Sequence, residues 1–165
     1  MKAAADPRRS LLAGALVGVG VAAFLDETVF HQLLQWHHFY DGSTTAVGIV
    51  SDGWFHAFGF TALVVGMFLF ADCQRRAALV RRRWGAGLLV GLGGFQLYDG
   101  LVQHKLMRLH QVRYDVELLP YDLAWNAPAL LALLAGVLLL RRSPAPARAR
   151  EGGAGRRGGT AGRTR

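Results

Sequence analysis

Cysteine is almost absent from this sequence: Cys73 is the only one among 165 residues. A single thiol excludes an internal disulfide framework and a cluster of thiolate metal ligands. Three motifs typical of metal and haem proteins are also missing: H-E-x-x-H, C-x-x-C-H, and a pair of Glu-x-x-His helices. We find no nucleophile paired with a base, so the sequence assigns no enzymatic reaction.

Long apolar runs are what the sequence has instead. A helix rises about 1.5 Å per residue, so roughly 20 residues cross a hydrocarbon core of about 30 Å. Because the runs are continuous rather than alternating, they favour helices over the strands of a membrane barrel. We therefore predict an all-α fold with four transmembrane helices, near residues 11–36, 53–72, 84–107 and 122–141.

The net charge of +8 is unevenly placed along the chain. Only Lys105, Arg108 and Arg113 lie near the loops expected on one side of the membrane, whereas the other basic residues flank the opposite side. The positive-inside rule then predicts that both termini and the loop at 73–83 are cytoplasmic. This placement accounts for the positive charge without nucleic acid, and the expected surroundings are a lipid bilayer.

The chain divides into three parts by composition. Residues 1–10 form a short basic arm, and residues 11–141 form the transmembrane domain. Residues 142–165 are rich in Pro, Ala, Gly and Arg, which favours a disordered basic tail. Within the domain we predict two helical hairpins, at about 11–72 and 84–141.

An internal repeat links the two hairpins. Residues 16–37 align without a gap with residues 89–110, at an offset of 73, and 9 of the 22 pairs are identical. Both copies would run from inside to outside, which predicts parallel repeats about an approximate two-fold axis along the membrane normal. The simplest arrangement is a four-helix bundle.

The repeat keeps acids and histidines inside apolar segments, where charge is costly and usually functional. At 100° per residue, Asp26 shares a helix face with His37 and lies about 140° from His31. Asp52 and His56 share a face of the next helix, at a spacing of four. The candidate metal or haem ligands are His31, His37, His56, His104 and His110. The candidate supporting carboxylates are Asp26, Glu27, Asp52, Asp99 and Asp122.

Several chemistries fit these residues. Imidazole and carboxylate groups ligate transition metals such as Zn, Fe or Cu(II), and two opposed histidines could ligate haem axially. Two alternatives use the same residues differently. One is an accessory or structural subunit of a respiratory or metal-delivery complex, with membrane-protein partners or as a homo-oligomer. The other is a proton or ion relay through the acids and histidines.

The symmetry of the repeat fails at two places. His56 has Asn126 as its counterpart, at an offset of 70, and Glu27 has Gly100, at an offset of 73. A site built from these helices should therefore be lopsided, with more ligands from the first hairpin than from the second.

Three stretches of the sequence resemble a known family. They are D-E-T-V-F-H-Q-L-L-Q-W-H-H at 26–38, D-G-W-F-H-A-F at 52–58, and D-G-L-V-Q-H-K-L-M-R-L-H-Q-V-R at 99–113. With Asp115 and Asp122, they resemble the bacterial membrane-protein family catalogued as domain of unknown function 2243. The resemblance implies a multi-pass protein of the bacterial inner membrane, and it carries over no activity.

Overall fold

The computed structural model describes residues 4–142 and is all-helical, as the sequence predicts. Residues 143–165 of the expected tail lie outside this range. Two of the helices change winding from α to π before they end. The elements are α1 (Pro7–Asp26) with η1 (Glu27–Leu33), α2 (Thr45–Arg75), α3 (Arg81–Leu97) with η2 (Tyr98–Met107), and α4 (Leu118–Arg141).

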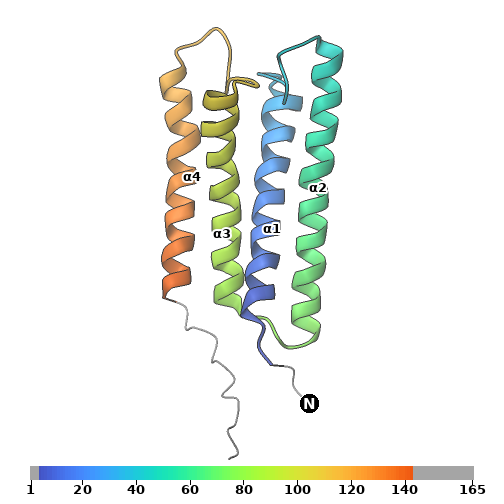
Figure 1. Ribbon diagram of the computed structural model, residues 1–165, viewed down its shortest axis with the longest axis vertical. Coiled ribbons are helices and arrows are strands. Elements are labelled where there is room, and N and C mark those ends of the chain that lie inside the picture. Colours follow the sequence, from blue (N-terminus) through green and yellow to red (C-terminus); the bar gives the residue numbers. More distant parts are fainter. Residues whose placement is uncertain (1–3, 143–165) are drawn as a thin grey trace, which may run out of the picture.

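The helices stand side by side in the order α2, α1, α3, α4 (Figure 1). Backbone contacts between helices join α1 to α2, α1 to α3, and α3 to α4. Between residues 4 and 142 no such contact joins α2 to α4, as a closed bundle would require. The expectation of a four-helix bundle is therefore not confirmed in its closed form, because α1 and α3 occupy the centre and each carries one outer helix.

Glycines explain why α1 and α3 pack so closely. A Cβ added to Gly14 would collide with the carbonyl oxygen of Trp84, and one added to Gly87 would collide with that of Leu11. These two contacts occupy matching positions of the sequence, 73 residues apart. Small residues let membrane helices approach until their backbones touch, as they do here.

The outer helices pack through glycines in the same way. A Cβ on Gly66 of α2 would lie 2.7 Å from the backbone nitrogen of Val17 in α1. A Cβ on Gly136 of α4 would lie 2.8 Å from the backbone nitrogen of Val90 in α3. The α1–α2 and α3–α4 contacts therefore use equivalent residues.

Three helices are long and apolar enough to cross a membrane: Pro7–Leu33, Thr45–Arg75 and Leu118–Arg141. The helix formed by α3 and η2 does not reach that apolar composition, because glycines and polar residues interrupt it. It lies between α1 and α4, so much of its surface faces protein.

All four helices begin earlier than the sequence suggested, at residues 7, 45, 81 and 118. Pro7 is the first residue of α1, since the side chain of Asp6 caps the helix by accepting a hydrogen bond of 2.9 Å from the backbone N–H of Arg9. Residues 7–10 of the expected basic arm are therefore helical. In α2, Thr44 is the capping residue, and its side chain accepts from the backbone N–H of Val47.

Candidate metal centre

The change from α to π winding brings each aspartate of the repeat to a histidine. In a π-helix, residues five positions apart lie close together, unlike in an α-helix. His31 Nε2 lies 3.8 Å from Asp26 Oδ1, and His104 Nε2 lies 2.9 Å from Asp99 Oδ2. The predicted separation of 140° between Asp26 and His31 is therefore wrong, because it assumed α winding throughout.

The chain reverses direction directly after each π-helix. Gln35 and Arg108, again 73 residues apart, take the left-handed conformation, with φ of 50° and 53°. The segments that follow fold back, so His37 and His110 enter the interior from loops. The expected extension of an α-helical face from Asp26 to His37 is thus incorrect, although both residues do reach the same cluster.

Four histidine rings pack against one another at this end of the molecule. The rings of His37 and His110 are stacked, with centroids 4.6 Å apart. His31 lies edge-on to His37 at 4.4 Å, and His104 lies edge-on to His110 at 4.6 Å. All four residues are at most 4% exposed.

Main-chain carbonyls orient the two stacked rings. His37 Nδ1–H donates to the carbonyl oxygen of Val112, and His110 Nδ1–H donates to that of Phe39, both at 2.8 Å. A carbonyl can only accept, so these bonds place the proton on Nδ1 and leave the lone pair on Nε2.

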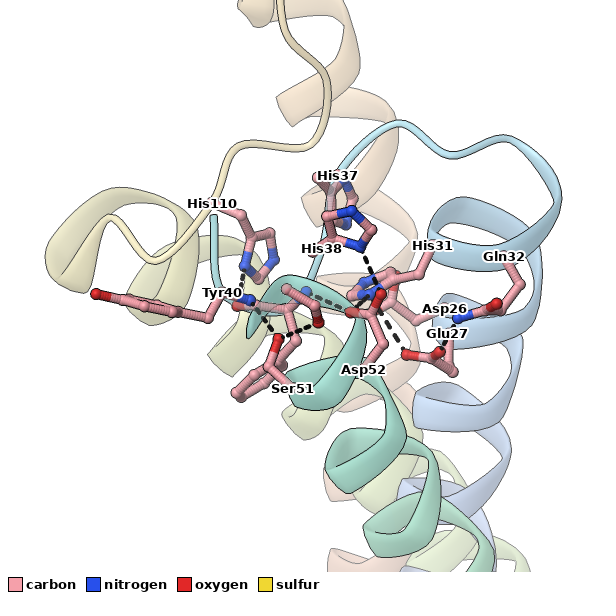
Figure 2. Close-up of polar contacts among 12 residues, drawn as sticks. Asp26, Glu27, His31, Gln32, His37, His38, Tyr40, Ser51, Asp52 and His110 are labelled. Atoms are coloured by element: carbon pink, nitrogen blue, oxygen red, sulfur yellow. Dashed lines mark hydrogen bonds and ion pairs between the residues drawn. The ribbon is translucent and has the colours of Figure 1, made fainter. Parts of the chain in front are cut away.

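Asp52 of α2 completes the inner part of the cluster (Figure 2). Its Oδ1 accepts from His31 Nδ1 at 2.9 Å and from the backbone N–H of Phe39 at 2.7 Å, and its Oδ2 lies 2.6 Å from His38 Nδ1. Glu27 Oε2 approaches the same nitrogen of His31 at 3.3 Å. One buried carboxylate therefore fixes a ring of the cluster and the loop that follows η1.

His38 was not among the ligands predicted from the sequence. It lies in a loop, where helical periodicity gives no information about facing. Its role in the structure is to hold Asp52.

Ring nitrogens converge in this cluster. The Nε2 atoms of His31, His37 and His110 have no hydrogen-bond partner within residues 4–142. One ring nitrogen from each of these residues lies within 4.8 Å of the others. Two further groups meet the same distance limit: Asp99, His104 and His110, and Glu27, His31 and Asp52.

Burial keeps the rings on the loops neutral. Loss of water around the ring, together with the neighbouring imidazoles, lowers the pKa of His37 to about 2. Burial likewise lowers the pKa of His110 to about 4, against the opposing effect of Asp99. Neutral imidazole is the form that binds metal ions.

The structure does not bring two of the predicted site residues to the cluster. His56 is exposed and lies edge-on to Phe24 at 5.7 Å. A step of four residues in an α-helix turns through 400°, so His56 is rotated about 40° from Asp52 and leaves the narrow face that α2 buries. Asp122 forms a partly exposed ion pair of 2.7 Å with Lys105.

The two hairpins contribute different residues to the cluster. At the position of Glu27, the second hairpin has Gly100, where a Cβ would collide with Asn126 Oδ1. The second hairpin therefore lacks an equivalent of the Glu27–His31–Asp52 group among the described residues.

Comparison with known proteins gives one result, and it concerns most of the chain. No curated protein and no solved structure matches the chain. A family model described as a predicted membrane protein, domain of unknown function 2243, matches residues 13–143. The match begins within α1, covers the rest of the helical part of the chain, and includes every residue of the histidine cluster. The chain is therefore a member of this membrane-protein family, domain of unknown function 2243.

Proposed function

We propose that this protein binds a transition-metal ion through His31, His37 and His110. The observation that carries the proposal is that the two nitrogens of each ring have different surroundings. One nitrogen is oriented by a carboxylate or carbonyl oxygen, and the Nε2 atom is buried without a hydrogen-bond partner in the described chain. Outer oxygen atoms of this kind orient metal-bound histidines in proteins.

The distances are compatible with a compact ion. Zn–N bonds of about 2.0–2.1 Å in a tetrahedral site place two ligand nitrogens about 3.3 Å apart. The three ring nitrogens lie within 4.8 Å of one another, so side-chain movements of roughly 1 Å close the remaining gap. Asp99 and His104, which group with His110, supply a further carboxylate and imidazole.

The donor set selects among cofactors. Imidazole and carboxylate ligands suit Zn, Fe and Cu(II), whereas Cu(I) sites recruit sulfur. Cys73 lies near the end of α2 opposite Asp52 and cannot contribute. Axial ligation of haem needs two rings on opposite faces of the macrocycle, but these rings pack directly against one another at 4.4–4.6 Å. The arrangement therefore favours a metal ion over haem.

The proposed setting is an inner bacterial membrane crossed by four helices, with both termini cytoplasmic. The helix Arg81–Met107 lies alongside α1 and α4, which supports its assignment as the fourth span. The concentration of basic residues at the termini and in the α2–α3 loop supports the orientation. Paired contacts at an offset of 73 support two parallel hairpins related by an approximate two-fold axis.

Metal analysis of the detergent-purified protein, before and after reconstitution with Zn²⁺, Fe²⁺ or Cu²⁺, tests the proposal. We expect metal in fixed proportion to protein, lost in His37→Ala and in His110→Ala. His56→Ala is the matched control, because this histidine is exposed outside the cluster, and it should keep the metal. Absence of metal with no uptake, or equal loss in the control, would refute the proposal.

A further inference from the structure

A groove in the apolar part of the molecule is not explained by the metal centre. It runs between α1, α3 and α4 and encloses a cavity of about 310 Å³. This volume lies at the lower end of the range for small-molecule sites, about 300–1,000 Å³. We name it the Asp26 groove. Its lining includes Ala22, Asp26, Phe30, Gln96, Ala124 and Trp125.

The groove contains a buried acceptor and a buried donor without partners. Asp26 is 2% exposed and Trp125 is 6% exposed. Among the described residues, neither carboxylate oxygen of Asp26 nor the indole Nε1–H of Trp125 has a hydrogen-bond partner. His31 Nε2, at 3.8 Å from Asp26, is beyond hydrogen-bond distance. A polar group that is buried without a hydrogen-bond partner destabilises the fold, so a ligand that pairs with both groups would relieve this cost.

A second groove, between α2 and α3, differs from the Asp26 groove in the size of its lining side chains. It encloses about 280 Å³ at equivalent positions of the other hairpin. Where the Asp26 groove has Ala22 and Ala124, the second groove has Phe95 and Trp54, at offsets of 73 and 70. Asp99, the counterpart of Asp26, is not among the residues that line it. Small side chains therefore leave Asp26 accessible from the first groove. Large aromatic side chains take the equivalent positions in the second groove.

We propose that the Asp26 groove binds a membrane-dissolved lipid with a phenolic head, of the quinol class. A phenol hydroxyl can donate to the Asp26 carboxylate and accept from the Trp125 indole N–H, which satisfies both unpaired groups. The rings of Phe30 and Trp125, edge-on at 4.8 Å, provide an aromatic wall for the head. Leu25, 53% exposed at the mouth, leaves an apolar exit for the tail into the bilayer.

Asp26 lies 3.8 Å from the proposed metal ligand His31, but none of the three proposed ligand histidines lines the groove. Quinol binding and metal content are therefore measured separately. Calorimetric titration of the protein in nanodiscs, under anaerobic conditions, measures binding directly. The probes are a decyl-substituted benzoquinol, the corresponding naphthoquinol, and the dimethyl ether of each. We expect saturable binding of at least one quinol and at least tenfold weaker binding of its ether, which cannot donate a hydrogen bond. Equal binding of both forms would overturn the proposal.

Variants of α4 locate the site. Ala124→Trp fills the Asp26 groove with a tryptophan, the residue that the second groove has at the equivalent position, Trp54. This variant should weaken binding at least tenfold. Ala127→Trp is the matched control, because Ala127 is exposed on the same helix and does not line the groove. Trp125→Phe should weaken binding by about tenfold, from the lost hydrogen bond.

Folding and metal loading are measured on the same samples. If Ala124→Trp does not give a monodisperse protein, Pro128→Phe takes its place, since Phe58 is the equivalent residue of the second groove. Metal content should stay at the wild-type level in the variant used. Quinol affinity that is unchanged in a folded, groove-filling variant would overturn the proposal, whatever the metal content is.

Discussion

His37 and His110 are stacked with their ring planes 11° apart, and each is oriented by the main chain beside the other. His37 donates to the carbonyl of Val112, two residues after His110, and His110 donates to the carbonyl of Phe39, two residues after His37. This reciprocal pair ties the two loops together. The centre therefore requires both hairpins, and neither could hold its histidine in place alone.

The stacked pair predicts that the metal-free protein loses stability in mild acid. Both pKa values are lowered in the folded state, to about 2 for His37 and about 4 for His110, against about 6.5 in an unfolded chain. Between pH 6.5 and 4 the unfolded chain binds more protons, so stability is complete above this window and falls as the pH falls through it. The expected loss at pH 5 is roughly 2 kcal/mol per ring.

Thermal unfolding in detergent with a chelator, at pH 7.5 and at pH 5, measures this loss. The double variant His37→Gln, His110→Gln removes both titrating rings, and its unfolding temperature should depend less on pH than that of the wild type. An equal pH dependence in both proteins would show that other groups are responsible.

The two aspartates near the start of the second helix of each hairpin should respond differently to substitution. Asp52 accepts hydrogen bonds from His31 and His38. In Asp52→Asn one of the two acceptor oxygens becomes an NH₂ group, which cannot accept. Loss of such an orienting group lowers metal affinity about 10–100-fold. Asp122 is paired with the partly exposed Lys105, so Asp122→Asn should change metal affinity by less than about twofold. Competition with a metallochromic chelator measures both affinities, and equal losses would count against the role given to Asp52.

The α1–α3 crossing predicts a sharp difference between two glycines of α3. An alanine at Gly87 would meet the backbone of Leu11, which cannot move away, and overpacking of this kind costs about 1–3 kcal/mol. Gly94 has no atom within 4 Å of an added Cβ, so Gly94→Ala should be neutral or slightly stabilising. Thermal unfolding of the two variants in the same detergent gives the comparison. A stable Gly87→Ala protein would contradict the close approach.

Much of this molecule follows from its linear pattern. Continuous apolar runs can bury their backbone polar groups in a membrane only as helices, so four helices were predictable. The ungapped repeat identified Asp26, His31, Asp99 and His104 as related residues, and the structure buries all four. Their burial follows from local sequence, because polar groups on helices packed in a membrane face the protein interior.

The ligand geometry depends on information that helical periodicity does not contain. Sequence alone determined four helices, two segments that align at an offset of 73 with matching acids and histidines, and the difference between Glu27 and Gly100. Tertiary structure decided the π winding, which brings His31 to 3.8 Å from Asp26, and the chain reversals that return His37 and His110 to the interior. It also left His56 outside, because a helix that packs on one neighbour buries only a narrow face. These features depend on how segments about 70 residues apart in the sequence pack against each other. The number of residues per helical turn contains no information about that packing.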